Sequence, residues 1–168
     1  MKRDRLIVEV PVWPRVANYL NGLLDFANGE ADINARDIGF IIYNLVDTGL
    51  GIPIQKPHPG PVVRFRLPIK DELGKTFDGQ SFGITISETN ATRFNRFVDF
   101  MMRKELFDRL DLIVKRGENK RKSGKLKQEV EDFLEQYQID PQELSYDTLI
   151  KDYQRRRKLD KRYAGKMF

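Results

Sequence analysis

The sequence predicts an α+β protein in which a small antiparallel sheet of about three strands packs with helices and is followed by a C-terminal pair of helices. Two patterns predict this class. Short runs that are rich in β-branched residues or that alternate apolar and basic residues occur in the first half, and longer runs with helical spacing dominate the second. With 168 residues, 40% of them hydrophobic, the chain is long enough to bury one core and a small satellite domain.

The first elements are a strand and two helices. Residues 6–10, LIVEV, are β-branched and predict a strand. Pro14 suits the first turn of a helix, where its missing N–H costs nothing. Apolar residues then recur at helical spacing from Val16 to Ala27, and Asn28-Gly29 stops the run. A second helix is predicted over residues 35–47.

A loop, two strands and a long helix follow. Residues 49–61 are rich in proline and glycine and predict a loop. Residues 62–69 alternate apolar and basic side chains, which predicts a half-buried strand, and residues 82–87 predict a further strand antiparallel to it. Residues 91–114 return to helical spacing, and Ser87 or Thr89 is the expected cap.

The charge is distributed unevenly along the chain. Residues 115–168 hold 15 of the 30 Lys and Arg residues but 10 of the 25 acids, so the net charge of +5 belongs to this part and residues 1–114 are balanced. Such an asymmetry indicates a polyanionic partner, of which nucleic acid is the commonest. We therefore divide the chain into a core module (1–114), a solvated basic linker (115–125) and a helical unit that resembles nucleic-acid-binding modules (126–168).

Two helices are predicted after the linker. The first has one apolar stripe from Leu126 to Tyr137 and an acidic outer face. The last begins at Ser145, a good N-cap, and buries Tyr146, Leu149, Ile150 and Tyr153. The connection between them, about seven residues, is longer than the three or four of a standard helix-turn-helix.

The last helix carries a basic stripe opposite its apolar face. With Tyr146 at 0° and about 100° per residue, the positions of four basic residues fall between about 120° and 180°: Lys158, Lys151, Arg162 and Arg155. A helix of this form suits contact with a phosphate backbone or a major groove. Further positive charge comes from Arg156 and Arg157 in this helix and from the linker residues Lys120, Arg121 and Lys122. These nine residues are the predicted nucleic-acid-binding set, with DNA as the expected ligand.

Other readings of this tail stand beside that one. A C-terminal basic run can be a solvated face that suits the helix macrodipole. It can also dock an acidic protein, in which case the chain is a virion component or an assembly adaptor. An anionic membrane surface is disfavoured because the apolar face offers two tyrosines and no Trp or Phe. The 1–114 module is a candidate for self-association.

Enzymatic chemistry finds little support, and no cofactor is expected. His58 is the single histidine and lies in a proline-rich loop, while cysteine is absent. The acids Asp71, Glu72 and Asp78 lie near Lys70 and Lys75, but their spacing does not match that of a metal-dependent nuclease. No phosphate-binding glycine motif is present. We therefore expect a protein that is not an enzyme.

Three further residues have simple structural readings. Arg64 and Arg66 lie on the polar side of the 62–69 strand and offer a second, weaker candidate for nucleic-acid contact. Tyr163 lies in a basic context near the C-terminus, as some strand-transferring tyrosines do, but we interpret it as an aromatic residue at a helix end.

The N-terminus lacks the pattern of a signal peptide and no apolar run reaches membrane-spanning length, so a soluble cytoplasmic protein is expected.

Two segments, ITISETNATRFNRFVDFMMRKELF and FLEQYQID…LSYDTLIKDYQRRRKL, resemble small uncharacterised proteins encoded by phages and mobile elements of Bacteroidetes-type bacteria. The resemblance covers roughly half of the chain. It implies a role in the DNA transactions of a phage or mobile element and brings no catalytic residues. The core module is then specific to that group.

Overall fold

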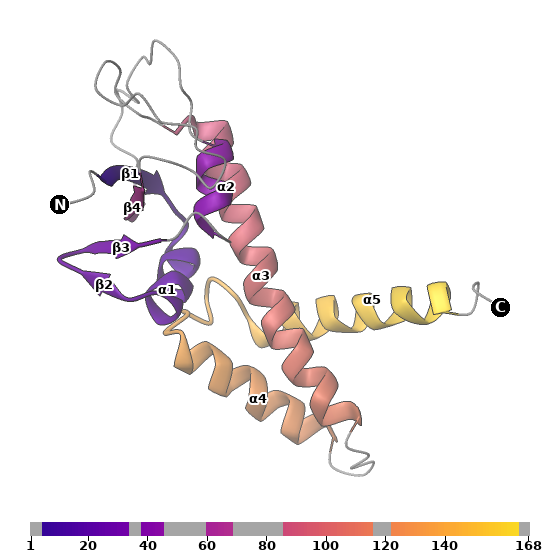
Figure 1. Cartoon of the computed structure of the whole chain (residues 1–168). Coiled ribbons are helices and arrows are strands. Elements are labelled where there is room, and N and C mark those ends of the chain that lie inside the picture. Colours follow the sequence, from indigo (N-terminus) through magenta and orange to yellow (C-terminus); the bar gives the residue numbers. More distant parts are fainter. Residues whose placement is uncertain (1–4, 34–37, 46–59, 69–85, 116–121, 165–168) are drawn as a thin grey trace. The chain divides into compact units, whose positions relative to one another are not determined.

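The protein is described by a computed structural model that covers residues 5–33, 38–45, 60–68, 86–115 and 122–164 (Figure 1). The elements are, in order, β1 (Arg5–Pro11), α1 (Pro14–Leu23), β2 (Phe26–Ala27), β3 (Glu30–Asp32), α2 (Ile38–Leu45), β4 (Val62–Pro68), α3 (Glu88–Lys115), α4 (Lys122–Gln136) and α5 (Tyr146–Ala164). They form two compact units, Met1–Asp99 and Phe100–Phe168, so the division falls inside α3. The α+β class is confirmed.

The sheet of the first unit differs from the predicted one in size and in direction. It has four strands among the described residues, in the order β1-β4-β3-β2. β1 and β4 pair antiparallel, with Val8 opposite Phe65, but β3 and β4 run parallel, with Ala31 opposite Phe65. The expected sheet of about three antiparallel strands is therefore corrected to a mixed sheet. The predicted strand at 82–87 falls mostly outside the described residues, and both neighbours of β4 are accounted for by β1 and β3.

The two additional strands, β2 and β3, come from a tight hairpin in a segment whose residue pattern predicted the end of a helix. Helix α1 ends at Leu23, and Ala27 lies in β2, paired with Glu30 of β3. The turn residues Asn28 and Gly29 have φ values of 56° and 76°. Positive φ at both central residues is the signature of the primed turns that suit the twist of β-hairpins, and Asn-Gly is their preferred sequence. The dipeptide thus marks a hairpin and not merely the end of a helix.

The core of the first unit lies on one face of this sheet. The alternation predicted for β4 is confirmed, since Val63, Phe65 and Leu67 are buried and Arg64 is exposed. Phe65 meets Phe94 of α3 edge to face, with ring centroids 5.7 Å apart. On the polar face, Arg64 pairs with Glu9 at 2.8 Å and Arg66 pairs with Glu30. Both arginines named as a second candidate contact therefore have acidic partners within the sheet.

A buried asparagine ties the junction of β1 and α1 to α3. Asn95 is only 3% exposed. Its side-chain oxygen accepts a hydrogen bond from the Trp13 backbone N–H at 2.7 Å, and its amide nitrogen donates to the carbonyls of Pro11 at 3.0 Å and Ala91 at 2.8 Å. Trp13 precedes the first turn of α1 and has no side-chain cap of its own, so Asn95 acts as a cap supplied from another helix.

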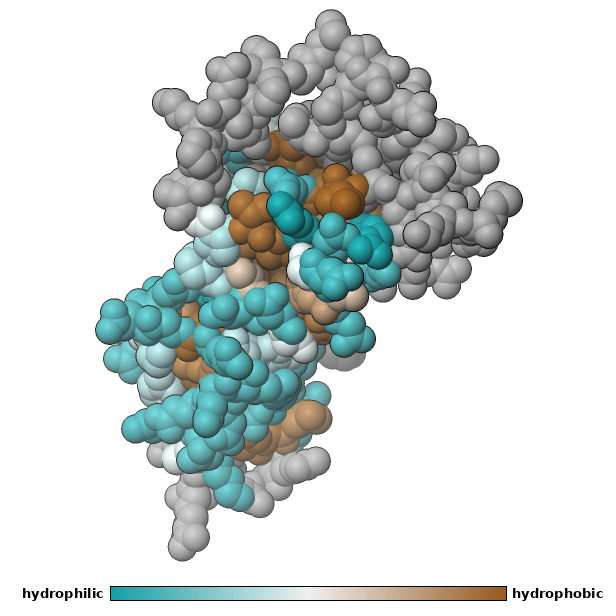
Figure 2. Space-filling view, turned by 90° about the vertical axis from the view of Figure 1, so that its left-hand side faces the viewer, coloured by the Kyte–Doolittle hydropathy of each residue, from teal (hydrophilic) through white to brown (hydrophobic). Residues whose placement is uncertain are grey.

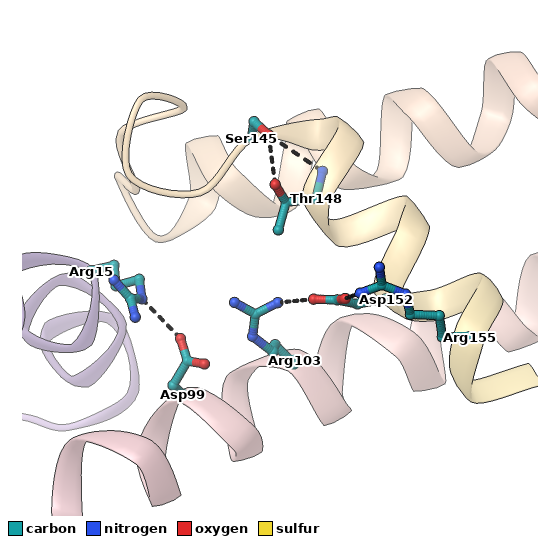
Figure 3. A network of polar contacts seen from close by, with 7 residues as sticks. All are labelled: Arg15, Asp99, Arg103, Ser145, Thr148, Asp152 and Arg155. Carbon is teal, nitrogen blue, oxygen red and sulfur yellow. Dashed lines mark hydrogen bonds and ion pairs between the residues drawn. The ribbon is translucent and has the colours of Figure 1, made fainter. Parts of the chain in front are cut away.

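A salt bridge lies next to this junction. Arg15 pairs with Asp99 of α3 at 2.9 Å (Figure 3). The Arg15 guanidinium also lies over the Trp13 ring, 4.5 Å from its centroid. The side chains of Arg15 and Asp99 are 23% and 15% exposed, so the pair is partly shielded from solvent. It adds a second link between α1 and α3 within the first unit.

The second unit is a three-helix assembly, because the C-terminal half of α3 packs with the two predicted C-terminal helices. Tyr137, directly after α4, donates its hydroxyl to Glu105 of α3 at 3.0 Å, and Arg109 of α3 stacks over the ring of Phe133 in α4 at 5.1 Å. All three helices contribute buried side chains to this unit: Met102, Leu106, Phe107, Leu110, Val130, Phe133, Leu134, Leu149 and Tyr153. The connection between α4 and α5 adds Tyr137, Ile139 and Leu144. The predicted pair of C-terminal helices, α4 and α5, is thus joined by the C-terminal half of α3 as a third helix. The boundary expected at residue 114 lies in the last turn of α3.

The ends of the helices follow their sequence signals. The Ser87 hydroxyl accepts from the Asn90 backbone N–H at 3.3 Å, and the Ser145 hydroxyl accepts from that of Thr148 at 3.3 Å, so both predicted caps are confirmed. Gln138, two residues after the last residue of α4, has a φ of 51°, as expected where a left-handed residue ends a helix. One boundary is corrected: α4 already begins at Lys122, so residues 122–125 are helical and not part of the linker.

The amphipathic pattern predicted for α4 is also confirmed. Val130, Phe133 and Leu134 are buried, whereas Glu131 and Asp132 are exposed. Figure 2 shows a largely hydrophilic surface over the part of the second unit that α4 occupies. Because its outer face is acidic, α4 is not the surface on which a polyanion would be bound.

Candidate nucleic-acid interface

The nine predicted residues do not all fall within the described part of the chain. Lys120 and Arg121 lie outside it. Lys122 is the first residue of α4 and Arg162 belongs to the last turns of α5, but the structure does not describe the side chains of these two residues. Five residues of the set remain, all on α5: Lys151, Arg155, Arg156, Arg157 and Lys158.

Two buried residues fix the rotation of α5 about its axis. Leu149 and Tyr153 are 1% and 2% exposed. The Tyr153 ring packs on Phe107 with centroids 5.6 Å apart, and its hydroxyl donates to Asp111 of α3 at 2.7 Å. Burial, and then the hydrogen bond to Asp111, raises the pKa of Tyr153 above its usual value. With this side locked against α3, the opposite side of α5 faces solvent.

The exposed side carries the predicted stripe. Lys151, Arg155 and Lys158 are all exposed. Lys151 and Lys158 make no ion pair with any residue that the structure describes. Two unpaired ammonium groups and one arginine thus lie along one side of α5, where each is accessible to a phosphate. The structure brings these three predicted residues together.

Arg155 belongs to a small charge cluster. The Asp152 carboxylate accepts from Arg103 of α3 at 2.7 Å through one oxygen and from Arg155 at 3.1 Å through the other (Figure 3). The Arg155 side chain is 75% exposed, against 21% for Arg103. An exposed ion pair contributes at most about 1 kcal/mol. Asp152 therefore mainly serves Arg103 at the helix interface, and Arg155 can exchange it for a phosphate.

Arg156 and Arg157 have internal roles instead. Arg156 pairs with Asp108 at 3.2 Å and Asp160 at 3.9 Å and lies over the Phe107 ring at 5.7 Å. A hydrogen bond from Lys104, followed by one from Arg156, holds the pKa of Asp108 below its usual range. Arg157 lies over the Tyr153 ring at 5.8 Å.

The sequence carried a signal for these roles. On the helical wheel, Arg156 lies at about 280° and Arg157 at about 20°. Both positions border the buried sector that contains Leu149 and Tyr153. Long side chains at such borders lay their stems along apolar surface.

An open groove of about 270 Å³ runs beside the stripe, within the second unit. It is lined by Leu126 of α4 and by Ile150, Tyr153, Gln154, Arg157 and Lys158 of α5. Lys158 belongs both to this groove and to the stripe. The groove is mainly apolar with a basic rim, and its size suits one or two aliphatic side chains.

The residues that the sequence analysis weighed for metal or catalytic chemistry lie largely outside the described part of the chain. Within the described part, no group of three or more His, Cys, Asp or Glu residues could hold a metal ion. His58, Asp71, Glu72 and Asp78 lie outside the described ranges, as do Lys70 and Lys75. Tyr163 lies within α5, but its side chain is not described.

Comparisons with known proteins do not assign the chain to a family. No family model, curated protein or solved structure matches it. Among the described helices, none combines the length and apolar character needed to cross a membrane.

Proposed function

We propose that this protein binds nucleic acid without catalysing a reaction, and that it does so through the basic stripe of α5. The observation that carries the proposal is the exposed row of Lys151, Arg155 and Lys158, held outward by the buried Tyr153 face. Arg162 occupies the next position of the same row in the helix. The resemblance to proteins of phages and mobile elements favours a DNA transaction as the setting.

Electrostatics sets the expected behaviour. A protein that neutralises about four phosphates gives a plot of log affinity against log salt with a slope of about −3.6. Affinity then falls on the order of 100-fold between roughly 50 and 200 mM salt. Fluorescence anisotropy with a labelled oligonucleotide, titrated at several salt concentrations, measures this slope directly.

A matched pair of variants locates the contact. The triple change Lys151→Gln, Arg155→Gln and Lys158→Gln removes three charges from the stripe. The control change of Lys104, Lys125 and Lys127 to Gln removes three charges from exposed positions of the same unit that lie off the stripe. We expect the stripe variant to reduce the magnitude of the slope of log affinity against log salt by about 2.7. The control variant should leave most of this slope unchanged. Equal effects, or no affinity at low salt, would contradict the proposal.

A second function is favoured by the groove beside the stripe. An acidic protein segment with an aliphatic residue could place that residue over Leu126 and Ile150 and its carboxylates near Lys158. The protein would then be a structural or adaptor component. A stable complex with an acidic protein, purified free of nucleic acid and lost on Ile150→Glu, supports this alternative. Loss of nucleic-acid binding in the Ile150→Glu variant does not support this alternative.

A further inference from the structure

The C-terminal end of α5 stands clear of the other helices of its unit. Lys158, Leu159 and Asp160 are consecutive and therefore point about 100° apart around the helix, yet all three are exposed. Asp160, near 320° on the helical wheel, lies between the directions of Leu149 and Tyr153, which are buried, yet it is exposed. The face that is buried earlier in α5 is therefore open to solvent at this end. Figure 1 shows the last turns of α5 extending past α3 and α4. From Lys158 to Ala164 this projecting end is about 10 Å long.

Basic residues occupy about a third of the circumference at this end. At about 100° per residue, the positions of Lys161, Lys158 and Arg162 lie between about 60° and 160°, and Arg155, just before the end, extends the sector to about 180°. The acid in this segment, Asp160, lies near 320° and pairs with Arg156 at 3.9 Å. The negative end of the helix dipole, roughly half a charge, is outweighed by these cations.

From this shape we infer that the projecting end of α5 enters the major groove of double-stranded DNA, an inference that rests on the proposed function. A helix with its side chains is about 10–12 Å wide, and the B-form major groove is about 12 Å wide and 8.5 Å deep. In that groove phosphates flank the helix on two sides. A basic sector of about 120° can reach both walls, whereas contact with a flat polyanionic surface requires only a narrow basic stripe.

Other nucleic acids fit this end less well. The major groove of A-form RNA is deep and narrow and does not admit a helix. Proteins that bind single strands usually stack the bases on aromatic side chains. On α5, Tyr153 is buried and the position of Tyr163, near 260°, lies away from the basic sector. Duplex DNA is therefore the ligand that the geometry favours.

The test compares a short DNA duplex with the RNA duplex of the same sequence and with the single DNA strand, all at one salt concentration and with the full chain. We expect the DNA duplex to bind about ten-fold more tightly than either. Bulky substituents at C5 of the pyrimidines, which fill the major groove, should abolish this preference. A competing ligand that occupies the minor groove should leave the preference for the DNA duplex unchanged.

The outcomes separate the two proposals. Equal affinity for RNA and DNA duplexes, or displacement by the minor-groove ligand, overturns groove insertion while nucleic-acid binding stands. Absence of binding to all three ligands overturns both. Lys161→Gln with Arg162→Gln, at the tip, should reduce the preference for DNA over RNA, whereas Lys127→Gln on α4 serves as the surface control.

Discussion

Replacing Asn95 by alanine tests the structural account most sharply, because this side chain is the internal cap of α1. Asn95→Ala removes the acceptor of the Trp13 N–H and the donor to the Pro11 carbonyl. The Ala91 carbonyl also lies four residues earlier in α3, where the backbone N–H of residue 95 can still donate to it. Two backbone groups are therefore left without their partner.

The magnitude follows from these losses. An unsatisfied buried polar group costs about 1–3 kcal/mol, and alanine returns roughly 0.5 kcal/mol of helix propensity. Because Trp13 is half-buried, solvent can satisfy part of its loss. We expect the free energy of unfolding of the first unit to fall by about 2–4 kcal/mol. Asn95→Asp should also destabilise, since a carboxylate accepts from Trp13 but cannot donate to Pro11.

The assay can use the single tryptophan of the chain, which lies at the affected junction. Urea unfolding followed by Trp13 fluorescence reports on the first unit. Arg96→Ala, one residue along α3 and exposed, is the control and should change stability by less than about 0.5 kcal/mol. A loss below about 0.5 kcal/mol for Asn95→Ala would refute the capping role.

Three further predictions concern the hairpin, the tyrosine and the arginines. Gly29→Ala should lower stability by about 1 kcal/mol because φ is positive there, and an unchanged or higher stability in urea unfolding would contradict the hairpin geometry. Gly124→Ala is the control and should not lower stability, because that glycine lies in the first turn of α4 and an added Cβ meets nothing within 4 Å. The raised pKa of Tyr153 means that the folded state holds this proton more tightly, so stability should decline as pH rises above about 10. Tyr153→Phe should lower the free energy of unfolding by about 1 kcal/mol at neutral pH, and this free energy should then fall less steeply at alkaline pH. An alkaline stability profile identical to that of the unmodified protein would contradict the role given to the Tyr153 hydroxyl. Arg156→Gln should reduce stability more than Arg155→Gln but change the salt dependence of nucleic-acid binding less, and the reverse order in thermal unfolding and anisotropy would contradict the separation of their roles.

Local signals in the sequence predicted much of the secondary structure. The alternation around Phe65, the proline at the start of α1 and the caps Ser87 and Ser145 each depend on neighbours within a few residues. Non-local pairing was harder to predict. The parallel pairing of β3 with β4 joins residues more than thirty positions apart, such as Ala31 and Phe65, and two- or three-residue strands carry no periodic signal.

The candidate interface shows the same contrast between features that local sequence patterns predict and features that depend on tertiary contacts. The buried face of α5 and the outward direction of Lys151, Arg155 and Lys158 follow from helical periodicity alone. The partners of Arg156 do not, because Asp108 and Phe107 belong to α3. Only the packing of the three helices shows which arginines are engaged internally and which are accessible.

The central claim is that α5 contacts nucleic acid through its basic stripe, and NMR titration of the labelled full chain with a DNA duplex tests it most directly. We expect the largest amide shift changes between Lys151 and Arg162, weakening as salt rises. The acidic outer face of α4, around Glu131 and Asp132, should show little change. Shift changes that spare α5, or that persist undiminished at high salt, would contradict the account.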